Sequence, residues 1–88
     1  MSVTIFVPPQ LRNYTQGASK VAAEGADVDA ALSNLSARFP GLKFRVIDEQ
    51  GRIREHMRIF VDGERVRDIA SPVRTNSEIH VFGALSGG

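Results

Sequence analysis

The chain has no cysteine among its 88 residues, and only 7% of them are aromatic. Without cysteine it has no disulfide bridge, no thiolate metal ligand and no cysteine nucleophile. Its charge is nearly balanced, with 11 basic and 10 acidic residues and a net charge of +1. This balance provides no strong electrostatic attraction to nucleic acid or to an anionic membrane, so neither is expected as a partner.

Long apolar segments are also absent. No apolar run approaches the ~20 residues needed to span a bilayer. Residues 1–9 lack the basic segment and apolar stretch of a secretory signal. The hydrophobic fraction of 42% is typical of a globular protein, and a chain of this length can bury one modest core. The sequence therefore predicts a single cytoplasmic domain over residues 1–88.

Residues that could carry catalysis are few and isolated. His56 and His80 are the only histidines, and neither has a cysteine or a pair of carboxylates nearby to complete a metal site. Tyr14 and Ser86 lack an adjacent general base, so neither is expected to act as a nucleophile. Motifs for phosphate loops, dinucleotides and metalloproteases are missing. We therefore expect no catalytic residue, no metal and no bound cofactor.

Runs of β-forming residues predict two hairpins and a final strand. The predicted strands cover residues 3–7, 19–23, 57–61, a short return strand ending at Val66, and 78–82. Pro8-Pro9 ends the first strand, and Asp62-Gly63 is a strong turn signal between the third and fourth. Residues 42–56 have apolar residues at positions 42, 44, 46 and 47 before a turn at 48–51, and they do not indicate one element.

A single amphipathic helix is predicted between the two hairpins. Asp27 is a suitable N-cap, Asp29 lies in the first turn, and Pro40-Gly41 ends the helix. Its apolar residues recur at helical spacing on one side: Val28, Ala31, Leu32, Leu35 and Phe39. Because one stripe means one buried face, the helix is expected to lie across a sheet.

The order of elements predicts an α+β fold. If the last strand runs parallel beside the first, the strands form one mixed sheet of four to five strands, with the main helix packed on one face. This arrangement is the ubiquitin-like β-grasp. After the last predicted strand only residues 83–88 remain, and they end in Gly87-Gly88.

On these features the sequence resembles the ThiS/MoaD family of sulfur carriers, which includes the CysO-type carriers of cysteine synthesis. The resemblance covers nearly the whole chain. It depends on the hairpin at residues 59–67, on residues 39–42, and on residues 78–82 followed by Gly87-Gly88. The chain departs from the family at Gly83, where members often carry proline, and at Asn76-Ser77, where they commonly have Gly-Asp.

The resemblance implies that the carboxylate of Gly88 is the reactive group. A ubiquitin-activating-like adenylyltransferase would use ATP to adenylate it, and sulfide or a persulfide would then displace AMP to leave a thiocarboxylate. A biosynthetic enzyme of the cysteine, thiamine or molybdopterin type would accept the sulfur. Glycine at positions 87 and 88 permits close backbone approach in a narrow nucleotide pocket, so residues 84–88 are expected to form a flexible reactive tail.

Two alternatives begin from the same adenylated terminus. The chain could be a ubiquitin-like modifier that is conjugated through Gly88 to lysines of other proteins. It could also be the small subunit of molybdopterin synthase. The sequence separates these functions poorly, because all of them need an exposed Gly-Gly end.

Strand alternation predicts an aromatic docking face on the side of the sheet away from the helix. Its predicted members are Phe6, Phe60, His80 and Phe82, with Leu85 of the tail added as a docking residue. Clusters of exposed aromatic side chains usually mark interfaces, and a carrier must dock on its enzymes. The alternative is that residues 42–56 or a loop cover these rings, which would make them a second small core.

Residues 43–58 are rich in basic side chains and could form a binding surface. Basic side chains near Phe44 could indicate an RNA-binding patch: Lys43, Arg45, Arg52, Arg54 and Arg58. Acidic residues at positions 48, 49 and 55 interleave with them, which favours a solvated mixed face over nucleic-acid binding. A further alternative is that these arginines meet an acidic surface on a partner protein.

Overall fold

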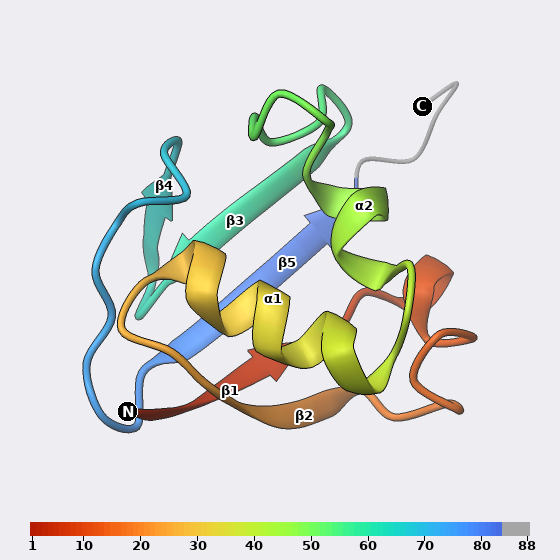
Figure 1. The fold of residues 1–88 in the computed structure, drawn as a ribbon, viewed down its shortest axis with the longest axis horizontal. Helices are drawn as coiled ribbons and strands as arrows, with labels where there is room; N and C mark the ends of the chain where they lie inside the picture. Colours follow the sequence, from red (N-terminus) through yellow and green to blue (C-terminus); the bar gives the residue numbers. More distant parts are fainter. Residues whose placement is uncertain (84–88) are drawn as a thin grey trace.

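A computed structural model describes residues 1–83, which form one mixed sheet and two α-helices. The strands are β1 (Ser2–Phe6), β2 (Lys20–Glu24), β3 (Met57–Val61), β4 (Glu64–Val66) and β5 (Glu78–Gly83). The helices are α1 (Val28–Arg38) and α2 (Leu42–Val46), with one short 3-10 turn, η1 (Pro9–Leu11). The strand order is β2-β1-β5-β3-β4, and α1 crosses one face of the sheet (Figure 1).

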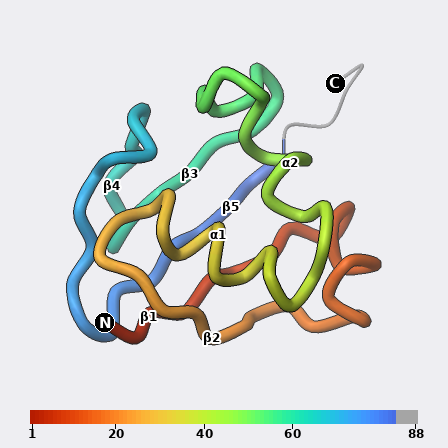
Figure 2. Tube along the Cα trace, viewed as in Figure 1, coloured from red at the N-terminus to blue at the C-terminus, as the bar shows by residue number. Residues whose placement is uncertain are grey.

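The two ends of the described chain pair in the middle of the sheet. β1 runs antiparallel to β2 and parallel to β5, and β3 runs antiparallel to both β5 and β4. Figure 2 shows the first and last strands side by side in the trace. This topology confirms the predicted ubiquitin-like β-grasp, and each predicted strand agrees with the observed one to within about a residue.

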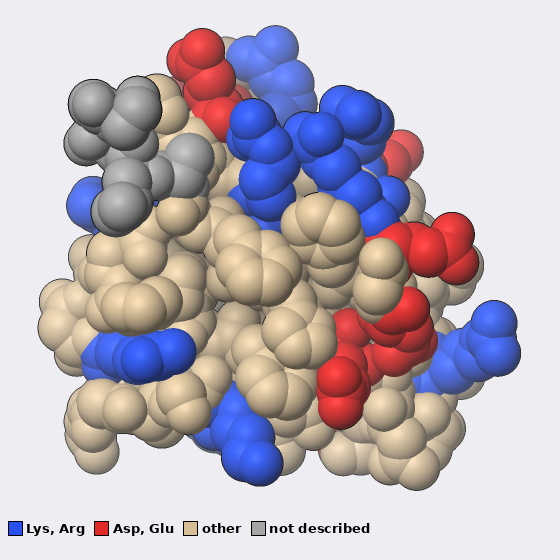
Figure 3. Space-filling view, turned by 180° about the vertical axis from the view of Figure 1, so that it is seen from behind, with Lys and Arg blue, Asp and Glu red and all other residues tan. Residues whose placement is uncertain are grey.

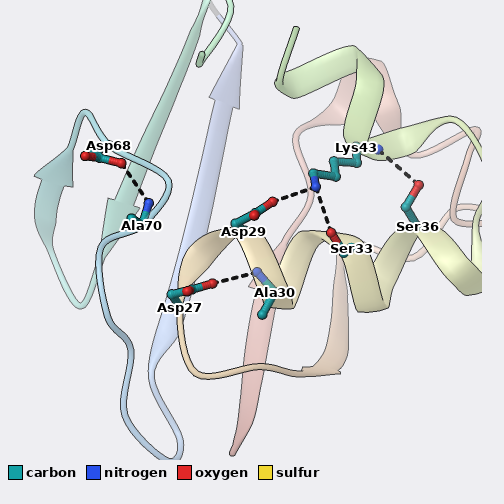
Figure 4. Close-up of polar contacts among 8 residues, drawn as sticks. All are labelled: Asp27, Asp29, Ala30, Ser33, Ser36, Lys43, Asp68 and Ala70. Carbon is teal, nitrogen blue, oxygen red and sulfur yellow. Dashed lines mark hydrogen bonds and ion pairs between the residues drawn. The ribbon is translucent and has the colours of Figure 1, made fainter. Parts of the chain in front are cut away.

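Helix α1 begins and ends close to where the sequence predicts. The Asp27 carboxylate accepts a hydrogen bond of 2.7 Å from the backbone N–H of Ala30 (Figure 4), which satisfies one unpaired donor of the first turn. The predicted stripe is buried at Val28, Ala31, Leu32 and Leu35. Phe39 differs from the prediction: it is the C-cap residue after the helix and is half-buried.

Helix α2 was not predicted. It has five residues, too few for a helical period to be read, and it buries Leu42 and Val46 at i, i+4 spacing. Lys43 connects α2 to α1 through two hydrogen bonds. The Lys43 Nζ lies 2.6 Å from Asp29 Oδ1 and 2.7 Å from Ser33 Oγ (Figure 4). Neither helix within residues 1–83 has the length and apolar character needed to cross a membrane.

One hydrophobic core lies between the sheet and the helices. Strand alternation also predicts that eight residues face the helix, and seven of them are buried: Val3, Ile5, Val7, Met57, Ile59, Ile79 and Val81. The eighth, Val61, is partly buried and packs against the same core. Since alternate residues of a strand point to opposite faces, burial of this set directs the intervening side chains to the other side of the sheet.

Candidate functional site

The predicted reactive residues Gly87 and Gly88 lie outside the described residues, as do Leu85 and the rest of the predicted tail at 84–88. The described chain leaves the sheet at Gly83, the last residue of the central strand β5. There the side-chain amide of Gln10 occupies the space that a Cβ on residue 83 would fill. Glycine at this position therefore allows the loop after β1 to close against the end of β5.

Four rings form one continuous cluster on the sheet face opposite α1. Phe6 and His80 are stacked with centroids 4.1 Å apart, and His80 and Phe82 are stacked at 6.0 Å. Phe60 meets Phe82 edge to face at 5.5 Å. We call Phe6, Phe60, His80 and Phe82 the aromatic face. The structure thus brings together the four predicted docking residues that it describes, while their docking role stays a prediction.

The aromatic face is open to solvent. Phe82 is 50% exposed, and the other three rings are half-buried against one another. Helix α2 packs instead on the α1 side, where Leu42 and Val46 are buried with Leu32 and Leu35. The geometry therefore favours an exposed surface over the alternative of a second core beneath residues 42–56. Seen from behind, this side shows a broad uncharged area with charged groups around it (Figure 3).

A pocket joins the aromatic face to the point where the chain leaves the sheet. It has a volume of about 340 Å³ and lies between the segment after β1 and the end of β5. Its lining includes Phe6, Pro8, Gln10, His80, Phe82 and Gly83. A protein that covers this end of β5 therefore also meets the aromatic face, and its apolar groups can bury Phe82.

The opposite end of β5 is fixed by Asp62. Its carboxylate accepts a hydrogen bond of 2.9 Å from the backbone N–H of Glu78 and one of 2.8 Å from the hydroxyl of Ser77. Both bonds favour the charged carboxylate and so lower the pKa of Asp62 below its ordinary value. The bond from the backbone N–H of Glu78 contributes most. Asp62 and Asn76 both have positive φ, 49° and 68°, in the two turns that meet here. The turn between β3 and β4 is thus bonded to the start of β5.

Sequence reasoning missed part of the basic surface. Arg65 and Arg67, which follow the Asp62-Gly63 turn, gather with Arg52, Arg54 and Arg58 around one pocket, whereas Lys43 and Arg45 do not line it. The ring of Phe44 is covered by the Arg54 guanidinium, 4.5 Å from its centroid. A cation therefore already occupies one face of this ring. The signal in the sequence was the two-residue Asp62-Gly63 turn, which pairs Val61 with Glu64 and so places Arg65 opposite Phe60.

Comparison with known proteins agrees with this fold. The family model of the ThiS family matches residues 5–88. The sulfur carrier protein CysO of Mycobacterium tuberculosis is 30% identical over 93 residues, which cover 100% of each chain. A chain in the crystal structure of the Amycolatopsis orientalis BexX/CysO complex is 28% identical with a TM-score of 0.91, covering 98% of this chain and 99% of that one.

A more distant likeness concerns the fold alone. The crystal structure of SAMP1 from Haloferax volcanii is 24% identical with a TM-score of 0.84, and the match covers 100% of both chains. The family match, by contrast, includes the hairpin, the last strand and the terminal Gly87-Gly88. Both the predicted resemblance and the observed β-grasp are confirmed by these comparisons, and the chain belongs to the ThiS family.

Proposed function

We propose that this protein is a sulfur carrier of the CysO type and that the carboxylate of Gly88 is the group that carries the sulfur. The observation that supports this best is the extent of the family match, which runs from residue 5 through Gly87-Gly88. The relative with 30% identity over the full length is itself a sulfur carrier protein. In this proposal the chain is a protein substrate, and the catalytic groups belong to its partners.

The chemistry needs an activated terminus because a carboxylate is a poor electrophile. A carboxylate oxygen of Gly88 attacks the α-phosphorus of ATP on an adenylyltransferase, which forms an acyl-adenylate and releases pyrophosphate. Hydrosulfide then adds to the carbonyl carbon, and AMP leaves with the electron pair of the broken C–O bond while a proton goes to solvent. The product is a thiocarboxylate on Gly88, which a cysteine-forming enzyme would accept as its sulfur source.

The proposed function also assigns a role to the aromatic face. We take Phe6, Phe60, His80 and Phe82, together with Leu85, as the surface that docks on the activating enzyme. The pocket that Phe6, His80 and Phe82 share with Gly83 supports this, since a partner bound at the end of β5 covers these rings as well. The similar Amycolatopsis chain is part of a BexX/CysO complex, which supports the assembly of such carriers with partner proteins.

Intact-mass measurement tests the proposal. The full chain is incubated with its activating enzyme, ATP and sulfide, and we expect a product heavier by the exchange of one oxygen for sulfur. Deletion of Gly88, or addition of one residue after it, should abolish this product while the unfolding temperature stays unchanged. Thiocarboxylate formation by the deletion variant would contradict the assignment to Gly88.

The same experiment separates the two alternatives, since all three functions begin with an acyl-adenylate. A protein modifier would give a ladder of isopeptide conjugates that depends on Gly88 and on target lysines. A subunit of molybdopterin synthase would purify with a larger subunit as a stable complex. Accumulation of the thiocarboxylate form, without either result, is the outcome expected for a sulfur carrier.

A further inference from the structure

A second surface feature adjoins the aromatic face. A pocket of about 380 Å³ lies between the segment that precedes β3 and the strand β4. Five arginines and one carboxylate line it: Arg52, Arg54, Arg58, Arg65, Arg67 and Glu55. We call this the arginine cleft. The whole chain has a net charge of only +1, so the positive charge is concentrated locally.

Three of the five guanidinium groups have polar partners within the described chain, and only that of Arg52 is paired with a carboxylate. Arg52 lies 3.6 Å from Asp48, and Arg54 donates to the carbonyl of Phe44 while covering its ring. These contacts hold both side chains at the rim of the cleft. Because Arg54 has no carboxylate partner among the described residues, its charge adds to that of the other three arginines.

The other three arginines lack carboxylate partners in the described chain. Arg58 donates to two backbone carbonyls, those of Glu55 and Met57, which fixes its position without neutralising it. Among residues 1–83, no carboxylate lies within 4.0 Å of Arg58, Arg65 or Arg67. The pKa of Arg65 is lowered, first by partial desolvation and then by the charges of Arg67 and Arg58. An anionic group in the cleft would relieve this repulsion.

Strand register makes the arginine cleft continuous with the aromatic face. Arg58 on β3 lies opposite Phe82 on β5, and Arg65 on β4 lies opposite Phe60 on β3. Cross-strand partners share a face of the sheet. In Figure 3, basic side chains gather at one edge of the uncharged area. A partner that covers the aromatic rings therefore reaches the guanidinium groups without changing its orientation.

The composition of the arginine cleft indicates which anion fits. Guanidinium groups bind carboxylates and phosphates with paired hydrogen bonds. The partly exposed apolar residues Ile53 and Val66 also line the pocket, and a peptide can cover them with its own carbon atoms whereas a free phosphate cannot. Glu55 in the wall and the near-neutral chain disfavour nucleic acid, which needs a track of unopposed cations.

We propose that the arginine cleft receives an acidic segment, rich in Glu or Asp, of a protein that docks on the aromatic face. The identity of that protein rests on the proposed docking function, whereas binding in the arginine cleft does not. Charge complementarity of this kind increases the rate of encounter and fixes orientation. Binding of the acidic segment would hold the partner in the orientation in which it also reaches the end of β5.

An NMR titration tests this inference with a defined probe. A short oligoglutamate peptide is added to the 15N-labelled full chain, and we expect backbone amide shifts at residues 52–58 and 64–67. The variant with both Arg65→Glu and Arg67→Glu should bind about tenfold more weakly or not at all. Both residues are exposed, so this variant should keep its unfolding temperature. The matched control, Lys20→Glu with Arg45→Glu, has the same net charge and should bind like the original chain.

Inorganic phosphate and a short oligouridylate at equal ionic strength are the competing probes. Tighter binding of either one in the arginine cleft would overturn the acidic-segment assignment. No amide shift with oligoglutamate, or equal weakening in both variants, would also overturn it. The result is independent of the chemistry at Gly88, because a Gly88 deletion should bind the peptide normally and yet form no thiocarboxylate.

Discussion

The imidazole ring of His80 lies flat against the phenyl ring of Phe6, with centroids 4.1 Å apart and planes within 5° of parallel. The two residues face each other in register across the parallel pair of β1 and β5. Phe82 continues the stack at 13° to His80. Because backbone pairing holds these rings, a partner meets a preformed surface and little side-chain freedom is lost on binding.

Replacement of a ring in the aromatic face should affect binding more than folding. Phe82→Ala and Phe60→Ala should weaken association with the activating enzyme by ~1–3 kcal/mol, as for aromatic hot spots, at little cost in unfolding free energy. Calorimetric titration and thermal unfolding measure the two quantities. Global unfolding of the Phe60 or Phe82 variant would show that these rings belong to the core.

Acid should weaken the fold through Asp62. Its carboxylate has a folded pKa below the ordinary 3.8, because the N–H of Glu78 and the hydroxyl of Ser77 bind the charged form. The stabilisation is therefore complete above the unfolded pKa and is lost as the pH falls through the lower folded value. Asp48, whose pKa is lowered mainly by the backbone N–H of Arg52, adds to the effect.

Urea unfolding at a series of pH values measures this contribution. Below pH ~4 the unfolding free energy should fall less steeply in Asp62→Asn than in the original chain. Asparagine suits this position because it tolerates the positive φ of 49°. An identical acid slope in both proteins would show that the bonds to Ser77 and Glu78 do not stabilise the charged carboxylate.

Gly25 is predicted to be intolerant of a methyl group. A Cβ there would lie 2.8 Å from the carbonyl carbon of Ala30 and closer still to the backbone nitrogen of Ala31. Backbone of α1 cannot move aside cheaply, so Gly25→Ala should cost about 1–3 kcal/mol of unfolding free energy. Gly83→Ala is the matched comparison, since its Cβ would meet only the end of the Gln10 side chain. Equal losses in the two variants would contradict this reasoning.

The contact of α2 with α1 should be weakly stabilising. Lys43→Met removes the ion pair with Asp29 and the bond to Ser33. Since the paired side chains are 30% and 46% exposed, the loss should be about 1 kcal/mol or less and should shrink at high salt. Arg45→Met on the same helix is the control. A loss that does not change with salt would show that packing of the lysine stem, and not its charge, holds α2.

Much of the fold could be predicted because local signals agree with the tertiary arrangement. The alternation in β1, β3 and β5 identified both faces of the sheet, and Asp27 together with Pro40 bounded the main helix. Helix α2 could not be predicted, because its five residues are held by burial of Leu42 and Val46 and by Lys43, all of which depend on α1. A segment this short has little helical stability of its own.

By itself the sequence determined the β-grasp pattern, the family and the terminal Gly87-Gly88, since these depend on residue type and on order along the chain. Only the tertiary structure decided that four rings from three strands form one stacked surface beside the end of β5. It also brought Arg65 and Arg67 together with Arg52, Arg54 and Arg58 around one cleft. The physical reason is strand register, which joins residues far apart in sequence through backbone pairing that no local pattern records.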